Sequence, residues 1–423
     1  MSFADRYLAA QKDFYPYIKE KPEHDLNIIV VIPCFNEPDL ITTLESLRKC
    51  SKTVQSCEII VVFNAAEGSP ARILEQNRRS FGMFENWREH SPSAGRKFYS
   101  IWKEDLPDKF AGAGLARKIG MDEAIFRFNR TGNDRGVIAS FDADTVCDPD
   151  YLSEIERHYR DFPDTNGTTV YFEHPLSGDE YPDRIYQGVL QYELNLRYHN
   201  SALKWCGFPY GHHTIGSCFT VKALCYVRQG GMNKRKAGED FYFIQKLAPL
   251  GNFHNITTTR VIPSPRPSDR VPFGTGSAVL KFVRDENEVM LTYHPDAFRY
   301  LRSFFLQTDQ YYGIEEEKIP EKLEKLPGPV REFLDILEFT GRITEINSNS
   351  SSPESFRKRF FRWFNAFRII KYLNFVHMKH FTKIPVAEAG REILKETGLE
   401  IPENTEASRL LEIYRKLERF DNK

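Results

Sequence analysis

The sequence predicts an α/β fold, in which a mostly parallel sheet is flanked by helices and followed by a helical C-terminal region. Two observations support this prediction. Short apolar runs, typical of strands buried on both faces, alternate with helical patterns from Leu26 to Phe141. From about Val279 onward, apolar residues recur only at helical spacing.

The first β-α-β unit begins with LNIIVVIP, Leu26 to Pro33, a nearly unbroken apolar run that predicts a buried strand. Leucines recur at helical spacing from Leu40 to Leu47, and Asn36 or Asp39 can cap that helix. CEIIVVF, Cys57 to Phe63, predicts a second buried strand.

The alternation continues along the chain. The further helices are predicted at Ala71–Arg79, Leu115–Phe128, Ile185–Tyr198, Ala223–Gln229 and Glu239–Leu250, and the further strands at Phe98–Trp102, Val137–Phe141, Cys218–Val221 and Ile256–Ile262. Sheets of this kind bind ligands at the carboxyl ends of their strands, so polar residues that follow strands are the candidate functional residues.

The composition excludes several classes of protein. The 423 residues are 41% hydrophobic and 28% charged, which is typical of a globular protein. The formal net charge is −1, so no overall field attracts nucleic acid, and we expect no nucleic-acid partner. Seven scattered cysteines without a C-x-x-C pair indicate neither a zinc site nor a disulfide framework. No signal peptide or membrane-spanning stretch is evident, so we expect a cytoplasmic protein.

Asp142 and Asp144 come directly after the predicted strand at Val137–Phe141. Two carboxylates at i and i+2 on the turn that leaves a buried strand can hold a divalent cation, or one can hold the cation while the other binds a ribose. The alternative is a solvated turn. We interpret a second D-x-D, Asp148 and Asp150, as a turn and helix cap.

Gly238-Glu239-Asp240 begins another predicted helix. Its carboxylates suit either an N-cap that interacts favourably with the helix dipole or a general base. Gly112-Ala113-Gly114 also opens a helix, and its amides, with Arg117 and Lys118, could meet a diphosphate. This segment lacks the third glycine of a dinucleotide fingerprint, which argues against a Rossmann dehydrogenase.

In their order and spacing, these segments resemble the inverting glycosyltransferases of family 2, which have the GT-A fold. The resemblance covers roughly residues 26 to 262. Five blocks carry it: VVIPCFNEP (Val30–Pro38), EIIVV (Glu58–Val62), AGAGLARKIGMDEA (Ala111–Ala124), ASFDADTVCDPDYL (Ala139–Leu152) and IGSCFTVKALCYVRQGGMNKRKAGEDFYFIQKLAPLG (Ile215–Gly251).

The resemblance implies a role for each matching acidic residue. Asp142 and Asp144 match the D-x-D that binds the donor nucleotide and its Mg²⁺ or Mn²⁺, which neutralises charge on the departing diphosphate. Asp240 matches the general base that takes the proton from an acceptor hydroxyl as the oxygen attacks the anomeric carbon. Glu239 would contact the acceptor or the donor.

The resemblance also implies two sets of ligand contacts. The donor contacts would be Pro33, Asn36 and Glu37 in the loop after the first strand, Arg117 or Lys118, and Gly216 with Ser217 beneath the sugar. His212 and His213 could line the acceptor side, although a structural or solvent-facing role also suits them.

Two departures from the family pattern concern the ligands. The second strand is followed by Asn64 where the family usually has an aspartate pair, and Asn64 can hydrogen-bond a base edge without charge. The usual metal-binding His after the strand ITTTRVI is absent. Asp269 could replace it, while Arg266 and Arg270 could bind phosphate, and His254 is a backup metal ligand. The alternative for this segment is a surface loop held by salt bridges.

The C-terminal region contains a basic, aromatic segment without acidic residues, residues 356–380. Such a helix could lie on an anionic membrane and bring the protein to a lipid acceptor. The alternative is a helix whose aromatic stripe packs on the protein core, and nucleic-acid binding is a third interpretation. NSNSSSPES, Asn347 to Ser355, predicts a linker or exposed loop.

We therefore predict a GT-A-like catalytic domain at 1–278, with a nucleotide-binding half at about 26–150 and an acceptor half at about 151–278, and a helical region at 279–423. The predicted activity is metal-dependent, inverting transfer from a nucleotide-diphosphate sugar to a carbohydrate or lipid-linked acceptor, in the cytoplasm or at the inner face of the membrane. The alternatives are a non-catalytic nucleotide-sugar-binding scaffold and a sugar-1-phosphate nucleotidyltransferase. The absence of glycine from PCFNEPDL argues against the nucleotidyltransferase, which has a Gly-rich phosphate loop there.

Overall fold

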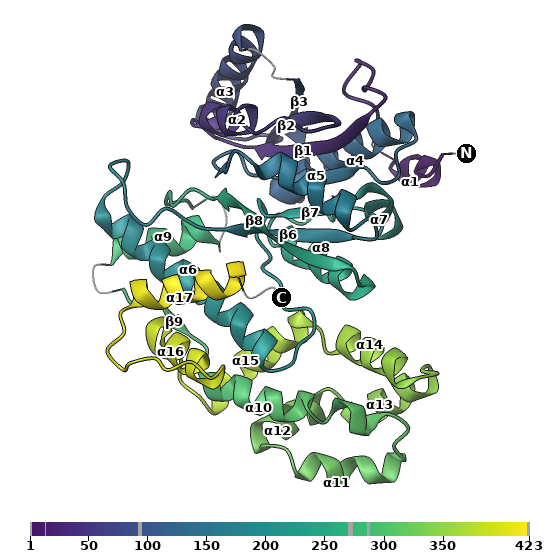
Figure 1. Cartoon of the computed structure of the whole chain (residues 1–423), viewed down its shortest axis with the longest axis vertical. Helices are drawn as coiled ribbons and strands as arrows, with labels where there is room; N and C mark the ends of the chain where they lie inside the picture. Colours follow the sequence, from purple (N-terminus) through teal and green to yellow (C-terminus); the bar gives the residue numbers. More distant parts are fainter. Residues whose placement is uncertain (1, 13, 92–94, 270–273, 286–287, 421–423) are drawn as a thin grey trace. The chain divides into compact units, whose positions relative to one another are not determined.

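The computed structural model describes residues 2–12, 14–91, 95–269, 274–285 and 288–420 (Figure 1). Its contacts divide the chain into two compact units. Unit 1 comprises Met1–Pro175, Thr214–Ser264 and Glu418–Lys423, and unit 2 comprises Leu176–His213 and Pro265–Leu417.

Unit 1 is built around an eight-stranded sheet of the order β3-β2-β1-β4-β7-β6-β8-β5. The strands are β1 (Leu26–Cys34), β2 (Ser56–Ala66), β3 (Arg96–Leu106), β4 (Val137–Ser140), β5 (Val146–Cys147), β6 (Gly167–Phe172), β7 (Phe219–Lys222) and β8 (Phe253–Ile262). Strands β3, β2, β1 and β4 are parallel to one another. Strand β7 is antiparallel to both β4 and β6, and β6 is parallel to β8, so β4, β6 and β8 run in the same direction.

Helices cover both faces of this sheet. On one face, α4 (Ala113–Thr131) packs on β1 and β2 and contacts α1 (Asp5–Ala10), α7 (Ala223–Arg228) and α8 (Glu239–Leu247). Side chains alternate between the two faces of a strand, and Val31 of β1 and Val62 of β2 belong to the core on the α4 side. On the other face, Phe63 contacts Phe81 and Phe84 of α3 (Ala71–His90), and α3 contacts α2 (Leu40–Arg48). Helix α5 (Tyr151–Asp161) packs against β8. The strands between these layers are therefore apolar on both sides.

Unit 2 consists of helices and a short antiparallel pair, β9 (Leu291–Thr292) with β10 (Ile384–Pro385), in the part of the chain that the structure describes. Helix α6 (Asp183–Trp205) packs against α9 (Thr275–Arg284) and α16 (Val386–Glu396). The other α-helices are α10 (Pro295–Phe305), α11 (Ile319–Glu324), α12 (Gly328–Ile336), α13 (Phe339–Ser348), α14 (Pro353–Trp363), α15 (Ala366–Lys379) and α17 (Ala407–Phe420), whose residues from Glu418 onward group with unit 1.

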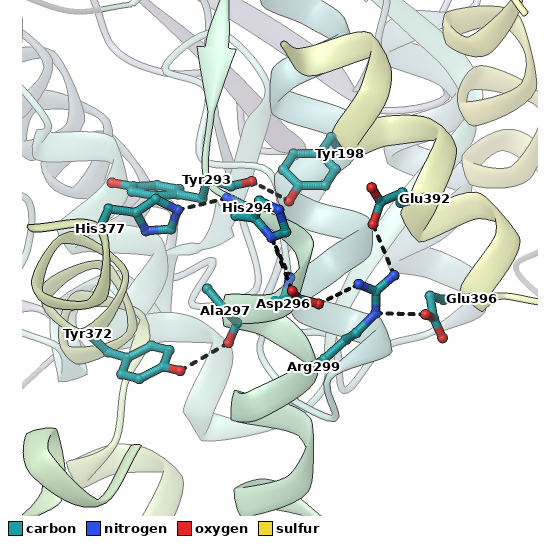
Figure 2. A network of polar contacts seen from close by, with 10 residues as sticks. All are labelled: Tyr198, Tyr293, His294, Asp296, Ala297, Arg299, Tyr372, His377, Glu392 and Glu396. Atoms are coloured by element: carbon teal, nitrogen blue, oxygen red, sulfur yellow. Dashed lines mark hydrogen bonds and ion pairs between the residues drawn. The ribbon is translucent and has the colours of Figure 1, made fainter. Parts of the chain in front are cut away.

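Polar contacts tie the start of α10 to α15 and α16 within unit 2 (Figure 2). Arg299 forms ion pairs with three carboxylates, those of Asp296, Glu392 and Glu396, at 2.5, 3.0 and 2.8 Å. On the other side of α10, the backbone N–H of His294 donates to Nε2 of His377 at 2.8 Å. The Tyr372 hydroxyl donates to the carbonyl of Ala297 at 3.1 Å. These contacts fix α10 from two directions.

The basic, aromatic segment forms two helices, α14 and α15, rather than one. Phe360 is fully buried and its ring centroid lies 5.6 Å from that of Phe304 on α10. Trp363 is 9% exposed, whereas Phe367 is 40% exposed. Most of the aromatic stripe thus belongs to the core of unit 2, where apolar side chains are removed from water. The membrane contact predicted through 356–380 relied on an exposed aromatic face, and most of that face is buried in unit 2. None of the described helices has the length and apolar character needed to cross a membrane.

The predicted fold class is confirmed: a sheet flanked by helices is accompanied by a helical C-terminal region. The unit boundaries differ from the predicted division at 278/279, because α6 and α9 group with the C-terminal helices. Leu194 of α6 shares one apolar core with Val386, Leu394 and Leu410. Helix α6 therefore has its apolar partners in a part of the sequence about two hundred residues away, which no local pattern reveals.

Candidate functional site

The two acidic motifs meet in unit 1 through one buried cation, Arg117 of α4. This residue is 3% exposed, and its guanidinium donates from Nη2 to Asp142 and from Nη1 to Glu239. Burial lowers the pKa of Arg117, but the charges of Asp142 and Glu239 outweigh it and raise the pKa further above its ordinary value. Arg117 is therefore a permanent counterion that joins the end of β4 to the start of α8.

Asp142 and Asp144 lie in a tight turn that follows β4. The backbone N–H of Thr145 donates to the carbonyl of Asp142 at 3.2 Å and closes the turn. From α2, the hydroxyl of Thr43 donates to the carbonyl of Ala143 at 2.8 Å. The Asp142 side chain is 33% exposed, and Asp144 is half-buried. The backbone of the turn is thus held from α2, while the two carboxylates stay partly exposed.

Asp240 is the second residue of α8. The preceding Gly238 has a φ of 70°, a left-handed conformation that favours glycine, and turns the chain into the helix. The backbone N–H of Phe241 donates to Asp240 Oδ1 at 2.7 Å. Burial and the nearby charge of Glu239 raise the pKa of Asp240 to about 7, against the opposing effects of Arg117 and this hydrogen bond. A carboxyl group that titrates near neutral pH is suited to proton transfer.

Gly216 lies directly beside the guanidinium of Arg117. A Cβ atom at this position would overlap Nη2 and lie 2.8 Å from Cζ of Arg117. The carbonyl of Gly216 accepts a hydrogen bond from the Ser140 hydroxyl at 2.6 Å, which links this segment to β4. The missing side chain of Gly216 therefore provides space for the cation that joins the acidic motifs.

The glycine-rich entry to α4 has a packing role that the sequence did not indicate. A Cβ atom at Gly112 would lie 2.7 Å from the carbonyl oxygen of Lys236, and one at Gly114 would overlap the carbonyl oxygen of Arg235. The two glycines thus allow the loop before α8 to approach the start of α4. That their amides meet a diphosphate stays a prediction.

Lys118 points away from the carboxylates of the site. Its ammonium donates to Asp122 Oδ2 at 2.8 Å and to the Tyr7 hydroxyl at 3.1 Å, and the Tyr226 hydroxyl donates to Asp122 at 2.9 Å. Adjacent residues of a helix project about 100° apart, which separates Lys118 from Arg117. Of the two cations predicted to face the donor, only Arg117 lies at the acidic motifs, and Lys118 belongs to a buried network between α1, α4 and α7.

Asn77 of α3 joins the loop after β1 to the end of β2. The backbone N–H of Asn36 donates to Asn77 Oδ1 at 2.8 Å, and Asn77 Nδ2 donates to the carbonyl of Asn64 at 2.9 Å. Asn64 is 2% exposed, and its Oδ1 has no hydrogen-bond partner among the described residues. The sequence analysis missed Asn77, although a polar residue on the buried face of an amphipathic helix is a signal for such a link.

The other two residues predicted in the loop after β1 have structural contacts. Pro33 lies near the end of β1, opposite Val62 of β2. Glu37 is 1% exposed, its Oε1 accepts from the backbone N–H of Asp39 at 3.0 Å, and its carbonyl accepts from the Ser80 hydroxyl at 2.5 Å. Glu37 therefore shapes the loop from within.

The second D-x-D ties the start of α5 to β8. Asp150 occupies the N-cap position but makes no side-chain cap, and its Oδ1 accepts from the Thr259 hydroxyl at 2.6 Å. Asp148 forms an ion pair with Arg260 at 3.1 Å. The backbone N–H of Tyr151 donates to the Asp148 carbonyl at 3.1 Å, as expected for a turn. The turn is confirmed, and the predicted side-chain cap is wrong.

His254 lies at the amino-terminal end of β8, where its Nδ1 is 3.1 Å from Nε2 of His158. Since β8 runs in the same direction as β4, His254 is at the opposite edge of the sheet from Asp142. Its prediction as a backup metal ligand is therefore wrong.

Five predicted site residues belong to the other part of the chain. The half-buried His212 and His213, together with Arg266 and the exposed Asp269, belong to unit 2, and Arg270 lies outside the described residues. Their roles toward acceptor, phosphate and metal stay predictions.

The donor atoms of the turn after β4 fit a cation that arrives with a ligand. Within the described ranges, no three His, Cys, Asp or Glu side chains gather closely enough to hold a metal by themselves. Mg²⁺ is commonly held by only one or two carboxylates, with phosphate oxygens and water completing its coordination. Asp142 and Asp144 supply such a pair, with oxygen ligands that also suit Mn²⁺.

Comparison with known proteins gives only distant similarity. No family model and no curated protein matches the chain. Among solved structures, the chain is similar to residues 1–349 of S. aureus TarS in complex with UDP-GlcNAc, with 12% identity, a TM-score of 0.42, and coverage of 80% of this chain and 93% of that one. The complex of the same fragment with UDP gives 11% identity, a TM-score of 0.39, and coverage of 90% and 95%. At such low similarity, any function must be argued from the site itself.

Proposed function

We propose that the protein is a family 2-like glycosyltransferase, which transfers a sugar from a nucleotide-diphosphate sugar to an acceptor hydroxyl with inversion and with Mg²⁺ or Mn²⁺ bound. One observation carries the proposal: Arg117 joins the D-x-D turn after β4 to the Glu239-Asp240 pair at the start of α8. Carboxylates suited to a cation and a carboxyl group with a pKa of about 7 thereby belong to one cluster.

Each residue of the cluster has a distinct task. Asp142 and Asp144 would hold the cation, which when bound supplies positive charge against the departing diphosphate. Arg117 orients Asp142 and Glu239 and keeps its own charge throughout. Asp240 takes the proton of the acceptor hydroxyl as the oxygen attacks the anomeric carbon. The bond from that carbon to the diphosphate breaks on the opposite face, and the electron pair leaves with the diphosphate.

The ends of β1 and β2 are the proposed place of the base. Asn77 fixes the backbone of Asn36 and Asn64, and the buried Oδ1 of Asn64 can accept one more hydrogen bond. A buried acceptor without a partner costs free energy, which a donor on the ligand would recover. Uracil, thymine and guanine each carry a ring N–H that could supply this hydrogen bond, so we favour UDP-, dTDP- or GDP-linked donors over CMP-linked ones.

Thermal unfolding with a panel of UDP-, GDP-, CMP- and dTDP-sugars, with and without Mn²⁺, tests donor binding. A ligand that binds only the folded protein raises the melting temperature. We expect a cation-dependent rise with one nucleotide, lost in Asp142→Asn and Asp144→Asn. Asp148→Asn is the matched control, because its D-x-D binds Arg260 instead, and should keep the response. A panel without any such rise contradicts the proposal.

Nucleotide release separates an enzyme from a non-catalytic scaffold. A scaffold would bind the donor without cleaving it. The proposed enzyme would slowly hydrolyse the donor, with water in place of the acceptor, and release the nucleoside diphosphate. We expect release by the wild type and a strong loss in Asp240→Asn, whose amide cannot take a proton. Donor binding without release in both proteins would favour the scaffold.

A further inference from the structure

Two cysteines from distant parts of the sequence meet beside the D-x-D turn. Cys50 follows α2, Cys147 ends β5, and their Sγ atoms lie 3.7 Å apart. The residues are 6% and 9% exposed, and the structure records both as free thiols. Neither thiol has a task in the proposed transfer reaction.

The backbone already holds the two segments together. The N–H of Ser51 donates to the carbonyl of Pro149 at 2.5 Å, and Cys50 Sγ lies 3.9 Å from the carbonyl oxygen of Asp148. A disulfide has a sulfur separation of about 2.05 Å, so the thiols must approach by less than about 2 Å. Side-chain rotation with a small shift of these two segments can supply this movement.

The two thiols have different environments. The hydrogen bond from Cys147 lowers the pKa of Cys50, and the guanidinium of Arg96, which donates to the Cys50 carbonyl at 2.8 Å, acts in the same direction. Burial raises the pKa of Cys147. Since the thiolate is the reactive form, Cys50 is the thiol that reacts first, and Cys147 is positioned to resolve the product.

We propose that Cys50 and Cys147 form a reversible disulfide when a peroxide reaches the protein. The thiolate of Cys50 attacks one oxygen of hydrogen peroxide, the O–O bond breaks, and the second oxygen leaves as water after protonation, which gives a sulfenic acid. Cys147 loses its proton and attacks the sulfur of Cys50, the S–O bond breaks, and a second water leaves. Each sulfur is oxidised by one electron, and one peroxide is reduced to two waters.

The expected effect on the donor site rests on the proposed function. Strand β5 begins at Val146, two residues after Asp144, and α2 holds the turn between the aspartates through Thr43 and Ala143. A bond between Cys50 and Cys147 therefore changes both supports of the turn at once. We expect donor affinity to fall roughly tenfold, because polar sites tolerate displacements of only about 0.5 Å.

Peptide mapping tests the disulfide without any donor. The folded, reduced protein is treated with hydrogen peroxide, its remaining thiols are alkylated, and the digest is examined by mass spectrometry. We expect a peptide pair that joins Cys50 to Cys147 and that dithiothreitol separates. The pair should be absent from Cys50→Ser and Cys147→Ser and present in Cys57→Ser, a control cysteine whose Sγ contacts the Glu58 carbonyl at 3.9 Å.

Each outcome decides one part of the proposal. Oxidation of the folded wild type to sulfinic acid without a linked pair, or linkage to other cysteines, would overturn the disulfide. If the serine variants fail to fold, reversal by dithiothreitol in the wild type carries the same test. Donor binding by the reduced protein tests the proposed function independently. If the reduced protein binds and the fully linked protein binds equally well, the disulfide has no regulatory role.

Discussion

Replacing Arg117 by methionine should destabilise unit 1 far more than loss of a surface ion pair. The guanidinium is 3% exposed and contacts both Asp142 and Glu239. Removal of one partner from a buried ion pair costs about 3–5 kcal/mol, since the carboxylate that remains is still out of water. An exposed pair contributes only about 0–1 kcal/mol.

The burial of the two carboxylates sets the expected magnitude. The Asp142 side chain is 33% exposed and can be hydrated again, whereas the Glu239 side chain is 4% exposed and cannot. Because only one carboxylate is left buried without its partner, we expect a loss of unfolding free energy near the lower end of the 3–5 kcal/mol range, about 3 kcal/mol. For a domain of about 150–250 residues, this is a fall in melting temperature of about 6–12 °C.

Thermal unfolding of the wild type and Arg117→Met, followed by circular dichroism at pH 5 and pH 8, measures this loss. The deficit should shrink at pH 5, because an unpaired buried carboxylate has a raised pKa and its penalty is relieved when it binds a proton. Lys118→Met is the matched control. It also removes the ion-pair partner of a buried carboxylate, that of Asp122, but should leave cation-dependent nucleotide binding intact. A loss below about 1 kcal/mol at pH 8, or a deficit that grows toward pH 5, would refute the reasoning.

Four further predictions concern the reaction and its site. Asp240→Asn should slow transfer by about 10²- to 10⁴-fold without weakening donor binding, as measured by nucleotide release and donor titration, and equal rates would exclude Asp240 as the base. The wild-type transfer rate should fall as the pH drops through about 7, where Asp240 takes up its proton, and a pH–rate profile that rises toward acid would contradict this. The pKa of Asp240 is about 3.9 in the unfolded chain and about 7 in the folded protein, so protonation of Asp240 stabilises the folded protein below about pH 3.9, and this contribution is lost as the pH rises through about 7. Thermal unfolding should therefore find Asp240→Asn more stable than the wild type at pH 8 but not at pH 4. Gly216→Val should displace the guanidinium of Arg117 and weaken cation-dependent donor binding, measured by titration, whereas Gly82→Ala, which meets no atom within 4 Å, should not.

The strands that the sequence predicted are those with continuous apolar runs, such as β1 and β2. Strand β6, GTTVYF, was not predicted because its start is polar. Its Thr168 is nevertheless fully buried, and its hydroxyl lies 2.7 Å from that of Thr220 on β7, which also contacts the Tyr159 hydroxyl at 2.8 Å. Buried threonines that satisfy each other across a sheet cannot be recognised without knowing which strands are neighbours.

The acidic residues of the site could be found in the sequence because each follows a strand or begins a helix. The choice between Arg117 and Lys118 could not be made, since it depends on how α4 is rotated against the sheet. The packing role of Gly112 and Gly114 could not be predicted for a related reason. Their neighbours in space, Arg235 and Lys236, come more than a hundred residues later, and only the tertiary structure brings that loop to α4.

Diffraction from crystals grown with Mn²⁺ and the nucleotide identified by binding, recorded at the manganese absorption edge, tests the proposed donor site most directly. We predict an anomalous peak within bonding distance of a carboxylate oxygen of Asp142 or Asp144, with the diphosphate beside it and the base near Asn64. A nucleotide bound away from the end of β4, with no manganese at either aspartate, would contradict the proposed function.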